Sequence, residues 1–281
     1  ADLFYLVAFP EHKLGKNVLG TRDSVNSMTP DMLRKHMDRF YSPASTVACF
    51  CGKFERDKII ALCKRYFSSP ANKSAIPVLP KADFCPGVHI FDKKTEQNQI
   101  VIGFSAPSLG SDSRFACQLI ASMLGGSASS RLFRRLREEQ GLVYSVDACA
   151  SSYLSAGVFA VSMGVSRESE KKAVLTAAEV LREFPDTVTE EELDLARDHY
   201  LSGLIMSLES NSARAARYGT GELLLGGAIS EKKLEEKIRG VSIDEIRSLA
   251  RSFSSLSDAC ICAVGRTAGA KFYNKVVSGK K

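Results

Sequence analysis

The sequence predicts an α/β (α+β) protein of two similar domains, each a mixed or antiparallel sheet packed with helices, the first of them incomplete. Three observations lead to this fold class. Segments with the periodicity of amphipathic helices alternate with short segments rich in β-branched and aromatic residues. Residues 29–52 recur as residues 242–265, and a proline-rich stretch separates the early elements from the late ones. The 281 residues are also enough for two domains.

The helices are predicted from capping signals and apolar periodicity. The segment Thr29-Pro30-Asp31 supplies an N-cap, a first-turn proline and an early acid, and the apolar pattern then runs to Phe40. Thr189 and Ser242 each stand three residues before a glutamate, which is the spacing of a capping box. The predicted helices cover residues 30–40, 56–68, 111–124, 129–139, 167–183, 190–209, 212–224, 231–238 and 243–253.

The strands and the linker are predicted from composition. Runs of β-branched and aromatic residues predict strands at 46–52, 88–93, 98–105, 143–152, 156–163 and 258–264. Four of the nine prolines fall between positions 70 and 86. We therefore expect residues 1–75 to close a truncated N-terminal domain, 76–86 to be a linker and 87–281 to form a complete C-terminal domain.

The internal repeat also predicts how much of the first domain is present. Both copies read as a capped helix, a turn and an apolar strand closed by glycine, and they share an acid, an aromatic residue, a cysteine and that glycine at matching positions. The offset is 213 residues, so a second copy beginning near Gly87 places the start of the first about 126 residues before Ala1. We expect the remaining part of the first domain to expose apolar side chains.

Composition limits the classes of function. Hydrophobic residues make up 44% and charged residues 25%, as in soluble globular proteins. The 38 basic and 32 acidic residues are interspersed, so the net charge of +6 does not require a nucleic acid partner. Residues 1–10 carry no secretion leader, and no apolar run reaches membrane-spanning length. We expect a cytoplasmic protein without a membrane partner, with reduced core thiols at Cys49, Cys51, Cys63, Cys117, Cys149, Cys260 and Cys262.

Metal ligation by this chain alone is not expected. The four histidines, His12, His36, His89 and His199, lack ligand spacing, and no H-x-x-E-H motif is present. Two Cys-x-Cys pairs, 49/51 and 260/262, place both sulfurs on one face of a strand. Metal binding is one interpretation of the pairs, and buried strand packing among apolar neighbours is the favoured one.

Two segments have both a phosphate-binding and a structural interpretation. Residues 124–130 (LGGSASS) combine glycines with a helix start, but they lack the P-loop ending, so a tight turn capped by Ser129 is favoured. The arginines at 131, 134, 135 and 137, together with the lysine-containing tail 271–281, could bind RNA or phosphate. Glutamates follow the arginines at once and no aromatic residues alternate with them, so a solvated helix face is favoured.

The same helix suggests a narrower function for one arginine. Arg137 ends the predicted helix, Gly141 permits a turn, and Tyr144 begins the next strand. This arrangement can direct a guanidinium and a phenol toward one point. Both groups could then donate hydrogen bonds to a substrate carbonyl and stabilise charge that develops on its oxygen.

These motifs resemble the pitrilysin/insulinase family of zinc metallopeptidases, and most closely its bacterial branch similar to the mitochondrial processing peptidase. Leu124-Gly-Gly-Ser-Ala-Ser-Ser-Arg-Leu-Phe133 is similar to the signature of the family's C-terminal half, and it is followed by Leu136-Arg-Glu138 and Gly141-Leu-Val-Tyr-Ser145. Residues 9–21 resemble its F-x-x-H-x-L-G-x-x-x-x-G-T stretch. The resemblance extends to about Gly265.

The resemblance implies two similar domains that close over an extended peptide, in subunits that pair as dimers. In the family, the first domain binds zinc through an inverted H-x-x-E-H helix and a downstream glutamate, and the second supplies an arginine and a tyrosine near the scissile carbonyl. Arg137 and Tyr144 have that seven-residue spacing, so the resemblance assigns the roles to them.

The sequence departs from the family at the zinc site, because it contains neither the zinc motif nor the third ligand. We therefore predict a fragment of a zinc metallo-endopeptidase that supplies substrate-binding and oxyanion-stabilising residues, with a peptide or unfolded polypeptide as its substrate. The intact family member carries zinc, whereas this chain alone is predicted to bind none and to be inactive. The alternative is a naturally non-catalytic structural or peptide-binding partner of a metal-bearing peptidase subunit, whether as a homodimer or a mixed pair.

Overall fold

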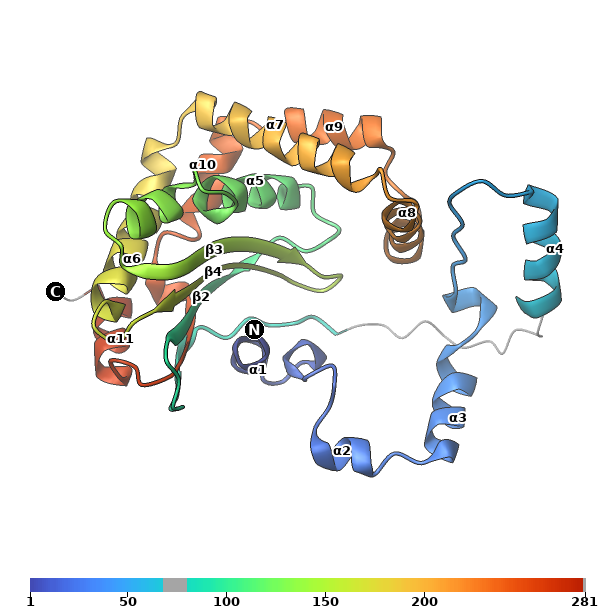
Figure 1. Ribbon diagram of the computed structural model, residues 1–281, viewed down its shortest axis with the longest axis horizontal. Helices are drawn as coiled ribbons and strands as arrows, with labels where there is room; N and C mark the ends of the chain where they lie inside the picture. Colours follow the sequence, from blue (N-terminus) through green and yellow to red (C-terminus); the bar gives the residue numbers. More distant parts are fainter. Residues whose placement is uncertain (68–79, 280–281) are drawn as a thin grey trace. The chain divides into compact units, whose positions relative to one another are not determined.

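The computed structural model describes residues 1–67 and 80–279 (Figure 1). These residues form two compact units. Unit 1 contains Ala1–Asn17, Pro80–Leu201 and Glu235–Lys281, and unit 2 contains Val18–Leu79 and Ser202–Leu234. The division of the sequence into domains at 1–75, 76–86 and 87–281 stays a prediction, and part of its linker lies outside the described residues.

A five-stranded mixed sheet forms the centre of unit 1, and it confirms the predicted fold class. The strands are β1 (Gly87–Phe91), β2 (Asn98–Ala106), β3 (Val143–Ser152), β4 (Gly157–Val165) and β5 (Cys260–Val264). Their order is β1-β5-β2-β4-β3, in which β1 and β5 run parallel and all other neighbours antiparallel. The β2–β4 ladder pairs Ile102 with Val161, and the β2–β5 ladder pairs it with Ile261.

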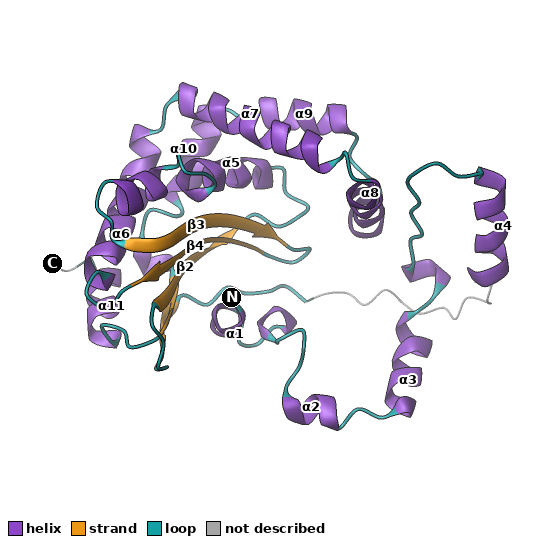
Figure 2. Ribbon diagram, in the orientation of Figure 1, coloured by secondary structure: helices purple, strands orange, loops and turns teal. Residues whose placement is uncertain are grey.

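Helices cover one face of this sheet, as Figure 2 shows for the purple helices above the orange strands. The helices of the chain are α1 (Asp2–Ala8), α2 (Arg22–Asn26), α3 (Pro30–Phe40), α4 (Arg56–Phe67), α5 (Ser113–Gly125), α6 (Glu170–Thr187), α7 (Glu190–Ser207), α8 (Asn211–Leu225), α9 (Glu231–Arg239), α10 (Ile243–Arg251) and α11 (Ala270–Val277). Helix α5 packs on β3, and α10 packs on both α5 and α6. None of the described helices is long and apolar enough to span a membrane.

The core between sheet and helices is built from alternate residues of the central strands. Ile100, Ile102 and Phe104 of β2 are at most 1% exposed. The Phe159 ring of β4 stacks on Phe253, which follows α10, with 4.6 Å between ring centroids. Burying one such side chain contributes about 1.5–3 kcal/mol, so this layer contributes substantially to the stability of unit 1.

Helix α1 packs on the opposite face of the sheet. Gly103 of β2 leaves room for the Phe4 ring, since a Cβ at position 103 would come within 2.2 Å of it. Phe9 is fully buried, and the Tyr153 hydroxyl donates to the Tyr5 hydroxyl at 2.8 Å. The N-terminal residues therefore belong to the hydrophobic core of unit 1.

Most predicted elements are confirmed within a few residues at their ends. The Thr29, Thr189 and Ser242 side chains all accept the expected capping hydrogen bonds. Helix α6 continues through Pro185 to Thr187, beyond the predicted end. Helices α1, α2 and α11 were not predicted, because short helices with few periodic positions give a weak signal.

The predicted strand at 46–52 is wrong. In the described residues this segment has no strand partner, and unit 2 leaves Val47, Phe50 and Phe54 more than a third exposed. A strand is defined by the ladder it makes with a neighbour, and no other described segment pairs with this one. Unit 2 therefore exposes apolar side chains, as the sequence predicts.

The prediction of core thiols is correct for three of the seven named cysteines. Cys117, Cys260 and Cys262 are buried, whereas Cys49 and Cys149 are exposed and Cys51 and Cys63 are intermediate. Burial raises the pKa of Cys117 and that of Cys260 to about 12. Cys49 lies in the segment without a ladder, and Cys149 lies on the outward-facing side of β3, which explains both exceptions. All eight cysteines are free.

Candidate functional site

The candidate site is built on a helix with π-helical hydrogen bonding. Residues Phe133–Glu138 form this π-helix, in which Glu139 N donates to Arg134 O at 2.9 Å. Leu132 and Leu136 are fully buried and hold the helix against unit 1. Isolated π-helical turns occur frequently at functional sites, because they rotate side chains away from their α-helical directions.

A glycine turn joins this helix to β3. Gly141 has φ +59°, in the left-handed region that glycine adopts without strain. Its N–H donates to Arg137 O at 3.2 Å, and Leu142 N donates to Leu136 O at 2.7 Å. The helix therefore ends with its carbonyl groups satisfied, and the chain reverses directly into β3.

Tyr144 lies at an irregularity of the edge strand. The β3–β4 register passes from Val143 opposite Val165 to Ser145 opposite Gly164, which leaves Tyr144 as an extra residue on β3. Such a bulge turns a side chain away from the regular alternation of the strand. The Tyr144 side chain is 58% exposed, and its hydroxyl has no hydrogen-bond partner among the described residues.

The structure brings Arg137 and Tyr144 together. The Arg137 Nη1 donates a short hydrogen bond to the Tyr144 carbonyl oxygen. The guanidinium carbon lies 5.3 Å from the centroid of the Phe133 ring, one helical turn earlier. Because a guanidinium carries five N–H donors, this contact fixes its position and leaves other donors for a ligand. The stacking on Phe133 was not predicted from the sequence, although the i,i+4 spacing of an aromatic residue and an arginine could have indicated it.

Arg131 ties the site helix to the helices behind it. Its Nε and Nη2 donate to the two Glu192 carboxylate oxygens at 2.8 and 2.6 Å, and Nη1 and Nη2 donate to the Thr187 side chain and carbonyl. Its guanidinium also lies over the Phe184 ring, 4.9 Å from the centroid. Burial raises the pKa of Glu192, but hydrogen bonds from Arg131 and Thr189 N and the charge of Arg131 outweigh it, so the pKa lies below its usual value. Arg131 therefore has a structural role.

The next two arginines also have acidic neighbours. Arg134 lies 4.0 Å from Glu139, and Arg135 lies 3.7 Å from Glu179. These exposed pairs agree with the favoured interpretation of a solvated helix face. Of the four arginines, Arg137 makes no ion pair with a described residue.

The glycine-rich segment before the site helix serves packing. A Cβ at Gly125 would come within 2.2 Å of Ala148 N on β3, so this glycine allows α5 to approach the strand closely. Ser130 is buried, and its hydroxyl donates to Ser127 O at 2.6 Å. Ser129, the predicted cap, shares a 3.0 Å hydrogen bond with the Ser127 hydroxyl. The segment is a tight turn with internal hydrogen bonds, as the favoured interpretation predicts, but no described helix N–H donates to Ser129, so the predicted cap is not formed.

The described residues do not provide a metal site. Within 1–67 and 80–279, no three His, Cys, Asp or Glu side chains lie close enough together to hold a metal ion. His12 illustrates this, because its Nδ1 accepts from Leu14 N at 3.1 Å and so completes a local turn. The ligand set of a zinc peptidase is therefore not present in this part of the chain.

Sequence comparisons identify relatives of the chain. A family model described as "Peptidase M16 inactive domain" matches residues 27–200. An uncharacterized zinc protease of Mycobacterium tuberculosis is 30% identical over 91% of this chain and 60% of its own length. The uncharacterized zinc protease YmxG of Bacillus subtilis is 30% identical over 89% of this chain and 61% of its own length. The chain thus spans about three fifths of these relatives.

Solved structures share the fold. A protease from Helicobacter pylori superposes with a TM-score of 0.81 at 18% identity, covering 93% of this chain and 65% of that chain. A peptidase M16 inactive domain from Pseudomonas fluorescens gives a TM-score of 0.80 at 17% identity, covering 95% and 65%. At these identities the likeness concerns the fold.

Proposed function

The chain belongs to the peptidase M16 family, and on this premise we propose that it supplies the peptide-binding part of a larger zinc metallo-endopeptidase. In this proposal Arg137 and Tyr144 bind the carbonyl group of an extended peptide. The observation that carries the proposal is their placement side by side, with the guanidinium fixed against the Tyr144 main chain and the phenol hydroxyl exposed. The spacing of the two residues in the sequence predicts the same pair.

The chemistry proposed for this chain is binding and orientation. A peptide carbonyl oxygen placed beside Tyr144 would accept a hydrogen bond from the hydroxyl and a second from a remaining N–H of Arg137. Both donors become more effective as negative charge develops on that oxygen, so they favour a tetrahedral oxyanion over the planar ground state. Because the described residues do not fit a zinc ion, no step that involves metal is assigned to them.

Peptide binding by the chain tests this proposal. Fluorescence anisotropy of a labelled, unstructured peptide should show saturable binding to the wild-type chain. R137A and Y144F should each weaken it by about tenfold, which is the size expected for losing one good hydrogen bond to a bound carbonyl. R182A is the matched control, because Arg182 is an exposed arginine on α6 and makes no described hydrogen bond or ion pair. Unchanged binding in both site variants would contradict the assignment.

Zinc content and peptide cleavage test whether the metal centre lies outside this chain, as the proposal requires. The purified chain should contain no stoichiometric zinc and should leave a quenched fluorogenic peptide intact, both before and after addition of equimolar zinc. Stoichiometric zinc with chelator-sensitive cleavage would mean that the described residues hold a site after all.

The partner-subunit alternative gives a different result when a zinc-bearing subunit is added. If this chain contributes to the active site, R137A should lower kcat of the assembly at least about tenfold, because removing one oxyanion donor typically costs about 2.7–4 kcal/mol. If the chain serves only as a structural partner, R137A should leave kcat unchanged. Light scattering of the chain alone tests whether it forms a homodimer, as the family resemblance implies.

A further inference from the structure

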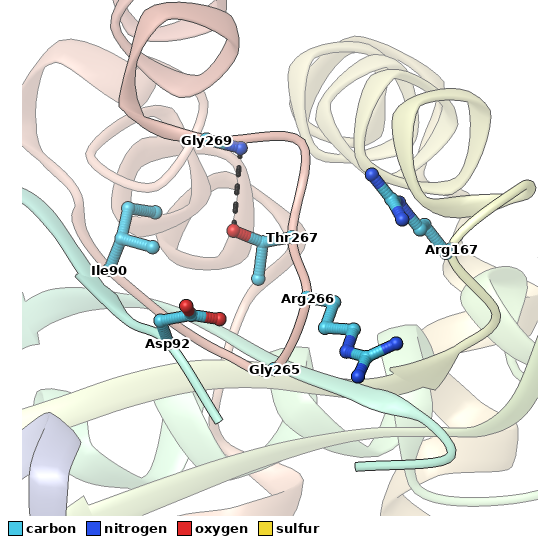
Figure 3. Close-up of a pocket in the computed structure, with 7 residues that line it drawn as sticks. All are labelled: Ile90, Asp92, Arg167, Gly265, Arg266, Thr267 and Gly269. Atoms are coloured by element: carbon cyan, nitrogen blue, oxygen red, sulfur yellow. Dashed lines mark hydrogen bonds between the residues drawn. The ribbon is translucent and has the colours of Figure 1, made fainter. Parts of the chain in front are cut away.

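A pocket of about 500 Å³ lies at one end of the unit 1 sheet, and neither Arg137 nor Tyr144 lines it. It is lined by Ile90, Asp92, Arg167, Gly265, Arg266, Thr267 and Gly269 (Figure 3). These residues follow or end β1, β4 and β5. The parallel strands β1 and β5 both end here, and the carboxyl ends of parallel strands are where α/β sheets commonly bind ligands.

Buried polar groups fix the loop that borders the pocket. Gly265 N donates to Phe91 O at 3.0 Å, the Asn98 side chain donates to Arg266 O at 3.2 Å, and Ala268 N donates to the Glu170 carboxylate at 2.9 Å. Glu170 is fully buried and Asn98 is 3% exposed. Since the loop is held before any ligand arrives, binding would not have to order it.

A glycine is required at the start of this loop. Gly265 has φ +132°, and a Cβ there would come within 2.2 Å of the Asn98 side-chain oxygen. The loop can therefore approach Asn98 and Thr95 as closely as it does only without a side chain at this position. Thr267 Oγ1 accepts a 3.3 Å hydrogen bond from Gly269 N, which leaves the hydroxyl hydrogen available to donate.

Two guanidinium groups line the same pocket as Asp92, and neither forms an ion pair with a described acidic residue. Neither Arg167 nor Arg266 makes a hydrogen bond or ion pair through its side chain with a described residue. The pKa of Glu168 is lowered mainly by its own backbone N–H and by Ser166, with a smaller contribution from the charge of Arg167. In Figure 3 both arginine side chains lie on the side of the loop away from Asp92.

We propose that this pocket binds a multivalent oxyanion, a small molecule that bears phosphate or carboxylate groups. Arg167 and Arg266 are the two charged donors. Guanidinium groups present paired N–H donors that match the oxygen spacing of phosphate and carboxylate, and the pocket is larger than a single phosphate requires. The site lies in unit 1 and depends on neither zinc nor a peptide substrate.

Isothermal titration of the chain with pyrophosphate and with citrate, at low ionic strength, tests the proposal. One of the two anions should bind with a stoichiometry of one. R167A and R266A should each reduce the affinity by about tenfold or more, and R266K should fall between R266A and wild type because it keeps the charge and loses the fork. Pyrophosphate binding without citrate binding would identify phosphate as the ligand group, and the reverse would identify carboxylate.

R182A is the matched control, because Arg182 lies on α6 twelve residues after the helix begins at Glu170, roughly 18 Å along its axis. It removes the same charge from the same unit and should bind either anion like wild type. The proposal is overturned if neither anion binds wild type at millimolar concentration, or if R182A weakens binding as much as R266A does. Thermal unfolding of each variant verifies that the exposed substitutions leave the fold intact.

Discussion

Replacing Glu170 by alanine should strongly destabilise unit 1. Glu170 is fully buried, and its carboxylate accepts three hydrogen bonds. The donors are the Tyr273 hydroxyl at 2.6 Å, the Asn98 amide at 2.7 Å and Ala268 N at 2.9 Å. Tyr273 itself is 0% exposed, so its hydroxyl cannot turn to water when the carboxylate is removed.

The cost of this substitution can be worked out from the groups it leaves without a partner. A buried donor left unsatisfied costs about 1–3 kcal/mol, and losing a bond to a charged acceptor falls in the upper part of that range. The Asn98 amide keeps its second bond, to Arg266 O, which lowers its share. The sum is about 3–5 kcal/mol, in the range that single substitutions reach when they break a buried polar network.

Thermal unfolding measures the effect. For a unit of this size, about 1 kcal/mol corresponds to roughly 2–4 °C, so a loss of about 3–5 kcal/mol in E170A should lower Tm by roughly 6–20 °C. Hydrogen exchange should also speed up in α11, because Tyr273 anchors that helix through Glu170. E183A is the matched control, since Glu183 is exposed on the same helix, and it should stay within about 0.5 kcal/mol of wild type.

Two outcomes would refute the reasoning. An E170A chain that melts within about 2 °C of wild type would mean that water or a rearranged side chain satisfies the three donors. Additive effects of E170A and Y273F in a double-mutant cycle would mean that the two side chains do not act through one shared hydrogen bond.

Three other predictions follow from the structure. R131A should remove an acid-sensitive contribution to stability, because the lowered pKa of Glu192 stabilises the fold above its unfolded pKa of about 4.3 and this stabilisation is lost as pH falls further. The difference in Tm between wild type and R131A should therefore shrink between pH 6 and pH 3, and a constant difference would contradict this. Alkaline titration should destabilise wild type more than Y273F, because burial and then the hydrogen bond to Glu170 raise the pKa of Tyr273. The stabilisation by protonated Tyr273 is fully present below its unfolded pKa of about 10 and is lost as pH rises toward the folded pKa. Equal alkaline unfolding of the two chains would count against this. G103A should displace Phe4 from the sheet and lower the free energy of unfolding by about 1–3 kcal/mol in urea denaturation. G110A, where a Cβ meets nothing within 4 Å, should be close to neutral. Similar losses of stability in both variants would show that loop entropy rather than the Phe4 contact decides the result.

The candidate site could be predicted in part from the sequence. The spacing of Arg137, Gly141 and Tyr144 indicates that the two residues meet after a glycine turn, and in the structure the Arg137 guanidinium contacts the Tyr144 main-chain carbonyl. The form of the contact could not be predicted. It depends on the bulge at Tyr144, which is set by the pairing of β3 with β4, a partner more than ten residues away along the chain.

The roles of the other arginines also depend on tertiary contacts. Arg131 and Arg137 stand on one short helix and look equivalent in the sequence. Arg131 meets Glu192, which is 61 residues away, while Arg137 meets the chain only seven residues on. Local pattern gives the number of charges on a helix face, and only the packed structure determines which of them are neutralised.

The repeat separates what local sequence determines from what neighbours determine. Residues 29–52 and 242–265 both begin with a capped helix, α3 and α10, and both continue into a 3₁₀ turn, at Pro43–Ser45 and at Leu256–Asp258. Both end on a glycine with positive φ, +139° at Gly52 and +132° at Gly265. These features coincide position for position at the 213-residue offset, so the local sequence is enough to specify them.

The copies differ most in the segment before that glycine. Cys260–Val264 is a buried strand because β1 and β2 flank it and supply hydrogen bonds on both sides. The matching residues 47–51 have comparable apolar character but meet no ladder among the described residues, and Phe50 is 47% exposed. Strand propensity describes how well a residue fits a half-buried sheet surface, so it has no effect where that surface is not provided. The error at 46–52 is therefore expected for any prediction that considers one strand at a time, and the five strands predicted correctly are those whose neighbours lie in unit 1.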